Sequence, residues 1–336
     1  MTTKLQDLAD YVGVSTATVS RVLNGRAGVS DSTRERVIGA LDALGYERPL
    51  RLRSKSKGLI GLIVPELENP IFPMFAQVIS GALARGGYMP LLCPRDAAGI
   101  GEDDYVEMLL DHQAAGIIFI SGLHADATSS PLRYQRLVSA NLPIVLINGF
   151  TPEVDTHFIS DDDTVAIELV TGHLTALGHR QIGLACGALR FTPMRRRADA
   201  FKQWWRQAGL DGDPDEAIRT SLLTVEGGQA AAGDLMDAGF TAIVCGSDSM
   251  ALGALRAAHA RGLSVPEDLS VVGYDDSALM GYTHPALTTV RQSVLAMGQA
   301  AVSILTAESS DIAHSAREML FRPELIVRDS TGLNRR

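Results

Sequence analysis

The stretch LADYVGVSTATVSRVLN, from Leu8 to Asn24, decides how the N-terminal part of the chain folds. Apolar residues before Gly13 recur at helical spacing, and this glycine then breaks the pattern. Ser15 is a good helix N-cap, so the pattern predicts a second helix from this residue through Leu23. Two short helices across a tight turn indicate a helix-turn-helix unit, although periodicity alone also allows a hairpin that merely packs.

A third helix is predicted from Ser30 to about Leu44, where it would brace the first two. With its apolar side turned inward, the second helix presents small polar side chains, one arginine and no acid. Short residues at a helix N-terminus let the backbone enter a major groove, and arginine can bind guanine with two hydrogen bonds. The candidate DNA-contacting residues of this face are Ser15, Thr16, Ala17, Thr18, Ser20, Arg21 and Asn24.

The charge distribution also favours nucleic-acid binding by the N-terminal segment. The 336 residues carry a net charge of -9, yet residues 1–57 hold ten Lys and Arg against six Asp and Glu. A basic head on an acidic body is typical of a chain whose head binds a polyanion.

Composition excludes several classes of protein. With 46% hydrophobic and 21% charged residues, the chain has the make-up of a folded globular protein rather than a disordered one. No apolar run reaches the roughly 18 residues of a membrane span, and the N-terminus has no apolar signal segment. The three cysteines are far apart, so we expect no disulfide framework, metal site or cofactor, and a cytoplasmic location.

From Gly58 onward, apolar strand patterns alternate with amphipathic helical patterns. Strands are predicted at 59–64, 89–93, 117–120, 144–147, 182–185, 242–245, 270–273 and 320–327. Helices are predicted at about 72–86, 102–113, 131–140, 162–177, 194–208, 228–238, 248–261 and 293–307. This alternation predicts an α/β body of parallel sheets flanked by helices, and its length predicts two lobes with a cleft at the strand ends.

Polar residues follow several predicted strands and suit a neutral polyol ligand. Ser121, Asn148, Ser247 and Asp275 each come directly after a strand pattern, and Arg197 lies one helical turn past another. Carboxylates accept hydrogen bonds from sugar hydroxyls, and arginine donates them in a fork. Each residue alone is more often a helix cap, but their recurrence in both presumed lobes favours a binding site.

Other residues near these strand ends have simpler interpretations. Asp248 and Asp276 are expected to be helix caps. Phe191 and Trp204 could stack on a sugar, although Trp204 lies in a predicted helix and is expected to pack in the core.

The run from Leu8 to Asn24, followed by Val29-Ser30 and Thr33-Arg34, resembles the head of the lactose/galactose-repressor (LacI/GalR) family of transcriptional regulators. Body segments such as HLTALGHRQIGLACG and GYDDS resemble the same family, so the likeness covers essentially the whole chain. The resemblance implies a three-helix DNA-binding head and a two-lobed body like that of periplasmic binding proteins. It also implies that Thr16 and Ala17 occupy the main base-reading positions, with Arg21 as a third.

The resemblance further implies contacts outside the second helix. Asn24, Ser30 and Thr33 would touch phosphate or the DNA backbone. In the family, the segment after the head folds on DNA into a hinge helix that inserts a leucine into the minor groove. Here that segment is shorter and lacks the usual Ala-Arg-Ser-Leu core. Leu52 is the candidate wedge, with Leu50 second and Arg51 a phosphate contact.

The resemblance also implies which residues bind the effector and which partners the protein has. The effector contacts would be Phe72, Ser121, Asn148, Arg197, Ser247 and Asp275. Segments such as GYERPLRLR, ELENPIFP and VEGGQAAAG resemble actinobacterial regulators of maltose and maltodextrin use. The implied protein is a dimeric repressor that binds double-stranded operator DNA and whose affinity is controlled by a sugar.

We therefore predict a helix-turn-helix domain at 1–46, a hinge linker at 47–57 and a two-lobed effector-binding and dimerisation domain at 58–336. The first lobe would comprise about 58–158 and 286–318, and the second about 159–285 and 319–330.

Two other functions are alternatives to a sugar-controlled repressor. An enzyme could use the acids at 161–163, the pair at 275–276, or His173 or His179, but adjacent acids point in different directions. The sequence has no P-loop, HExxH, nucleophile elbow or GxGxxG motif. A transporter's solute-binding protein shares the two-lobed body, but it would need a signal peptide and no DNA-binding head.

Overall fold

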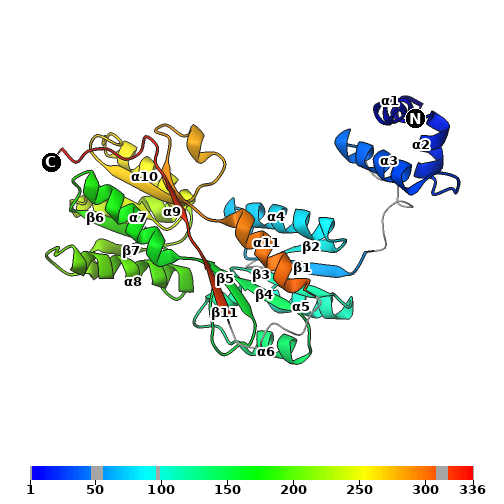
Figure 1. Cartoon of the computed structure of the whole chain (residues 1–336). Helices are drawn as coiled ribbons and strands as arrows, with labels where there is room; N and C mark the ends of the chain where they lie inside the picture. Colours follow the sequence, from blue (N-terminus) through cyan, green and yellow to red (C-terminus); the bar gives the residue numbers. More distant parts are fainter. Residues whose placement is uncertain (1, 47–55, 96–98, 308–316, 336) are drawn as a thin grey trace. The chain divides into compact units, whose positions relative to one another are not determined.

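Three helices form the N-terminal unit in the computed structural model: α1 (Thr2–Val12), α2 (Thr16–Leu23) and α3 (Asp31–Ala43) (Figure 1). The structure describes residues 2–46, 56–95, 99–307 and 317–335. The chain divides into one unit at Met1–Gly58, which we call the head, and a second at Leu59–Arg336, which we call the body.

The head folds around a small apolar core. Its buried members come from all three helices and are Leu8, Ala9, Val12, Val19, Val22, Val37, Ala40 and Leu41. Leu44 is the C-cap of α3 and, at 37% exposed, contributes little to this core. The end of α3 is instead held to α1 by the Tyr46 hydroxyl, which donates to Asp7 Oδ2 at 2.9 Å.

Among its described residues, the body contains two six-stranded sheets, each of which defines a lobe. The sheet of the first lobe has the order β11-β5-β4-β3-β1-β2, and all its pairings are parallel. Its strands are β1 (Leu59–Val64), β2 (Met89–Pro94), β3 (Gly116–Ile120), β4 (Ile144–Ile147), β5 (His157–Asp161) and β11 (Arg317–Phe321). Its helices are α4 (Ile71–Arg85), α5 (Glu102–Asp111), α6 (Leu132–Ser139) and α11 (Val294–Leu305), and α11 packs against α4.

The sheet of the second lobe has the order β12-β10-β9-β8-β6-β7, and only β10 and β12 pair antiparallel among its described strands. Its strands are β6 (Ile182–Cys186), β7 (Ile218–Thr220), β8 (Ala242–Cys245), β9 (Ser270–Asp275), β10 (Thr288–Arg291) and β12 (Glu324–Ile326). Its helices are α7 (Asp163–Ala176), α8 (Thr192–Gln207), α9 (Val225–Asp237) and α10 (Asp248–Ala260).

The borders of the lobes differ from those predicted. Strand β10 belongs to the second sheet, and β5 and β11 belong to the first, so the sheets divide the chain differently from the prediction at 159–161, 288–291 and 319–321. The single strand expected at 320–327 is two strands in different sheets. Pro323 separates them, because a residue without an N–H group cannot continue a ladder of hydrogen bonds.

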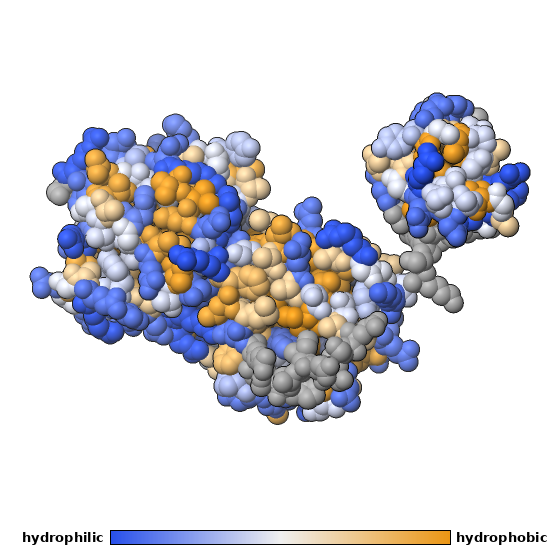
Figure 2. All heavy atoms as spheres, viewed as in Figure 1, coloured by the Kyte–Doolittle hydropathy of each residue, from blue (hydrophilic) through white to orange (hydrophobic). Residues whose placement is uncertain are grey.

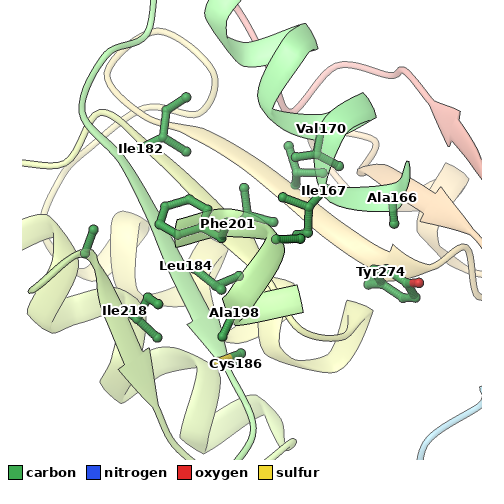
Figure 3. Close-up of a cluster of buried hydrophobic side chains, with 14 of the residues drawn as sticks. Ala166, Ile167, Val170, Ile182, Leu184, Cys186, Ala198, Phe201, Ile218 and Tyr274 are labelled. Atoms are coloured by element: carbon green, nitrogen blue, oxygen red, sulfur yellow. The ribbon is translucent and has the colours of Figure 1, made fainter. Parts of the chain in front are cut away.

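One core cluster of the second lobe lies between α7, α8 and its sheet, and another lies between the sheet and α9 and α10. Figure 3 shows Ala198 and Phe201 of α8 gathered with Leu184 and Cys186 of β6, and Tyr274 of β9 nearby. These side chains are almost fully buried, so they fix α8 against the sheet.

The surface of the body carries apolar side chains as well. Figure 2 shows hydrophobic residues gathered over α4 and α11, where Leu295 is 61% exposed. Within the described ranges, no helix combines the length and the apolar character that crossing a lipid bilayer requires.

Candidate DNA interface and ligand cleft

The predicted recognition face lies on α2 and is accessible. Thr16, Ala17 and Arg21 are exposed, whereas Thr18 and Ser20 are half-buried beside the core residues of the same helix. The first turn of α2 carries no acidic residue. The helix therefore offers short side chains at its N-terminus and one long cation in its last turn, as the sequence predicts.

Several other predicted DNA contacts hold the local fold. Ser15 caps α2, since its Oγ accepts from the backbone N–H of Thr18 at 3.1 Å. Ser30 caps α3 in the same way, with the Thr33 N–H as donor at 3.3 Å. Asn24 closes α2 by donating from Nδ2 to the Ser20 carbonyl at 2.8 Å. The capping hydrogen bond uses the serine oxygen. Backbone N–H groups in the first turn of a helix that lack an intrahelical partner can still bind a phosphate.

The linker residues named by the sequence, Leu50, Arg51 and Leu52, lie outside the described residues. The prediction of a minor-groove wedge therefore stays a prediction.

The polar residues at the strand ends of the body share an unusual backbone conformation. Ser121, Asn148, Asp275 and Asp276 have φ angles of 47°, 63°, 117° and 52°. Residues other than glycine rarely adopt positive φ, and such strain is concentrated at functional sites. Asn148 Nδ2 donates to Ser121 Oγ at 3.2 Å, so these two strand-end residues of the first lobe lie side by side.

Arg197 lies among the polar residues at the strand ends and is only 6% exposed. Its Nε donates to Asp163 Oδ1 at 2.7 Å and its Nη1 to the Gly246 carbonyl at 2.9 Å. The guanidinium lies 3.3 Å from the centre of the Tyr274 ring, a cation–π contact. A planar cation fixed on three sides in this way has a defined orientation.

Buried carboxyl groups surround this arginine. Asp275 is 4% exposed and accepts from Gln292 Nε2 at 2.6 Å. Burial raises its pKa well above the usual value, and the nearby Asp248 carboxyl raises it further. Burial likewise raises the pKa of Asp161 to about 7. Protonated carboxyls can donate as well as accept hydrogen bonds, which widens what this cluster can bind.

The helix caps near the cleft are not where the sequence placed them. Ser247 is the N-cap of α10, with its Oγ accepting from the Met250 N–H at 3.2 Å. Asp248 instead joins two segments by accepting from the Ser277 N–H at 2.7 Å and the Thr289 hydroxyl at 2.6 Å.

Asp276, the second expected cap, forms ion pairs with Arg291 at 2.7 Å and Arg328 at 2.6 Å. Both expectations were wrong because α10 begins one residue earlier than a cap at Asp248 requires, and no helix follows Asp276 directly.

The aromatic candidates are partly buried. Phe72 lies in the first turn of α4 and packs against the core of the first lobe. Phe191 is the N-cap residue of α8, and the Arg190 guanidinium lies 4.9 Å from the centre of its ring. Trp204 packs against the core of the second lobe, as expected.

Four cleft residues were missed by sequence reasoning: Asp161, Asp163, Tyr274 and Gln292. Asp161 ends β5 and Asp163 begins α7, so the two acids were visible only as a possible catalytic pair. The signal that could have found all four residues is their position, since each lies at or just after the carboxyl end of a strand or at the start of the next helix. One oxygen each of Asp161 and Gln292 is buried without a hydrogen-bond partner in the described structure. A ligand group could satisfy both.

Comparisons with known proteins agree with this architecture. Residues 4–48 match the model for bacterial regulatory proteins of the lacI family, and residues 171–331 match a periplasmic binding protein-like domain. The chain is 54% identical to the HTH-type transcriptional regulator MalR of Streptomyces coelicolor, over 99% of this chain and 97% of the relative.

Solved structures give the same result. One is a complex of the transcriptional regulator CelR with cellobiose. The CelR chain is 28% identical to this one with a TM-score of 0.71, and the match covers 97% of this chain and 99% of the CelR chain. Another is the lac repressor dimer bound to operator and the anti-inducer ONPF, also 28% identical, with a TM-score of 0.70 and coverage of 97% and 98%.

A helix-turn-helix head joined to a two-lobed ligand-binding body defines a DNA-binding transcriptional regulator. The chain belongs to the LacI family of bacterial regulatory proteins.

Proposed function

We propose that this protein is a cytoplasmic repressor that binds operator DNA as a homodimer and is controlled by maltose or a maltodextrin, without acting as an enzyme. The observation that carries the effector site is the Arg197 cluster, in which the buried Arg197 guanidinium lies near Asp163 and Asp275 of the second lobe and Asp161 of the first. The resemblance to actinobacterial maltose regulators and the 54% identity to MalR support the choice of sugar.

The chemistry of the cluster suits a neutral polyol rather than an anion. Arg197 is already paired with Asp163, so its charge is compensated before any ligand enters. Asp161, Asp275 and Gln292, at the ends of β5, β9 and β10, add further acceptors and donors. Sugar hydroxyls can satisfy such a mixed set, whereas a second negative charge would face several buried carboxyls.

A homodimer is proposed because one helix-turn-helix head covers only a half-site, which is too little DNA for useful specificity. Exposed apolar residues on the body are available for an interface: Met89, Leu92, Leu279 and Tyr282 are between 41% and 87% exposed. In such a dimer, paired linkers could fold together on DNA and respond to sugar bound in the body.

The test of this function is specific operator binding and its release by sugar. An operator is first selected from random duplexes by the full-length protein, and affinities are then measured by fluorescence anisotropy with and without maltose. Arg21→Ala is expected to weaken operator binding by about 1–3 kcal/mol, because it removes a base contact, while binding to random DNA changes little.

Arg26→Ala is the matched control, since Arg26 is exposed in the head but lies beyond α2. It should affect operator and random DNA equally. Equal losses on both DNAs for Arg21→Ala would mean that Arg21 touches only phosphate, and no effect of maltose on the wild-type complex would contradict the proposed effector.

The leucine wedge in the linker gives a separate prediction. Leu52→Ala is expected to weaken operator binding by more than about tenfold, because an inserted side chain offsets the cost of kinking the DNA. Affinity for maltose should stay unchanged, since the cleft is untouched. Leu50→Ala tests the register: if only this variant loses affinity, the wedge is Leu50, and if neither does, the linker inserts no leucine.

A further inference from the structure

A cavity separate from the Arg197 cluster lies between loops of the first lobe and the first turn of α8 in the second lobe. Its volume is about 270 Å³. Most of its lining comes from the loops that follow β3 and β4, directly after Ser121 and Asn148. The other wall is the first turn of α8, the helix that also carries Arg197. The cavity is therefore adjacent in the fold to the strand-end residues already described.

Contacts between the lobes form one side of this cavity. Asp126 pairs with Phe191 in an antiparallel bridge, and the Ala127 N–H donates to the Arg190 carbonyl at 2.9 Å. The Asp126 carboxylate also lies 3.2 Å from Arg190 Nε. The cavity is lined by residues of both lobes, so a ligand bound in it would contact the two lobes at once.

Arg195 is the cation of the cavity, and it differs from the two arginines that follow it. Arg196 forms a bidentate ion pair with Glu318 at 2.7 and 2.8 Å, and Arg197 is bound to Asp163. The Arg195 side chain is exposed, and its guanidinium makes no hydrogen bond or ion pair with any residue the structure describes. Its donors are free for a ligand.

Phe150 adds an apolar surface to the lining of the cavity. The Phe150 ring packs edge-to-face against the Phe158 ring at 5.0 Å between centroids, which fixes its orientation. It is half-buried and lines the cavity. The lining also includes the Glu153 carboxyl, whose pKa is held below the usual value by a hydrogen bond from Thr151.

A fixed aromatic ring, a free guanidinium, an ionised carboxylate and nearby serine hydroxyls are the groups that recognise a sugar ring. We propose that the cavity is a subsite for a second sugar ring, so that the effector is an oligosaccharide bound across the Arg197 cluster and this cavity. This inference rests on the proposed function and extends it, since it specifies that a monosaccharide fills only part of the site.

The experiment is isothermal titration of the full-length protein with glucose, maltose and maltotriose. The wild-type protein is expected to bind maltose at least about tenfold more tightly than glucose, because the second ring gains the cavity contacts. Arg195→Ala should remove most of that difference, lowering maltose and maltotriose affinity by about tenfold and leaving glucose affinity within about twofold.

Arg206→Ala is the matched control, since Arg206 is exposed in the last turn of the same helix and does not line the cavity. It should bind all three sugars as the wild type does. The subsite is overturned if the wild type binds glucose as tightly as maltose, or if Arg195→Ala weakens all three sugars equally or none. If the wild type binds none of these sugars, the proposed effector class fails and the subsite fails with it.

Discussion

Replacing Arg197 by alanine is expected to abolish the response to sugar and to lower the free energy of unfolding by about 3–5 kcal/mol. The guanidinium and its partner Asp163 are 6% and 5% exposed, so the variant leaves a buried carboxyl without its counter-charge. The Tyr274 hydroxyl, 3.5 Å from Asp163 Oδ1, is too far away to replace the arginine. Urea unfolding and a maltose titration measure the two effects.

Arg196→Ala provides a neighbouring control for the loss of an ion pair. The Arg196 and Glu318 side chains are 28% and 14% exposed, so water can solvate Glu318 when its partner is removed. We expect a clearly smaller loss of stability and a retained response to sugar. An Arg197→Ala protein as stable as Arg196→Ala would show that the buried pair does not hold the cleft together.

Much of the fold could be predicted because buried strands and amphipathic helices leave strong patterns. The strand at Leu59–Val64 is an uninterrupted apolar run, and its predicted bounds are those observed. The strands that were missed are short or polar: His157–Asp161, Ile218–Thr220 and Thr288–Arg291. The last of these contains two threonines that are fully buried, and sequence periodicity carries no sign of such burial.

The cleft was predicted only in part, since position along a strand can be inferred but partners cannot. Arg197 and Asp275 were named from their places after strands, whereas the pair of Arg197 with Asp163 joins residues 34 positions apart. The cavity beside Phe150 was missed entirely. It depends on the Asp126–Phe191 bridge between two loops, and loop conformation is the part of a fold that local pattern determines least.

Replacing Asp161 by asparagine should have the opposite effect to the arginine variant and stabilise the protein above neutral pH. Burial raises the pKa of Asp161 to about 7, against about 3.9 in an unfolded chain. The folded state therefore binds the proton more tightly, and its stability falls as the pH rises between these two values. Asparagine cannot ionise, so at pH 8 the variant should be more stable by about 2–4 kcal/mol, with little difference near pH 4.

Local contacts favour this outcome. The Ser293 N–H donates to Asp161 Oδ1 at 3.3 Å, and an asparagine oxygen can accept the same bond. The other oxygen, Oδ2, has no partner among the described residues, so the amide group displaces no hydrogen bond. Asp162→Asn is the control, because asparagine can cap α7 as Asp162 does. The Asp162 charge makes only the smallest contribution to the raised pKa of Asp161, so most of the pH dependence should remain. Thermal unfolding from pH 4 to pH 8 decides the matter: an Asp161→Asn protein less stable than the wild type at pH 8 would mean that the ionised carboxylate holds the lobes together.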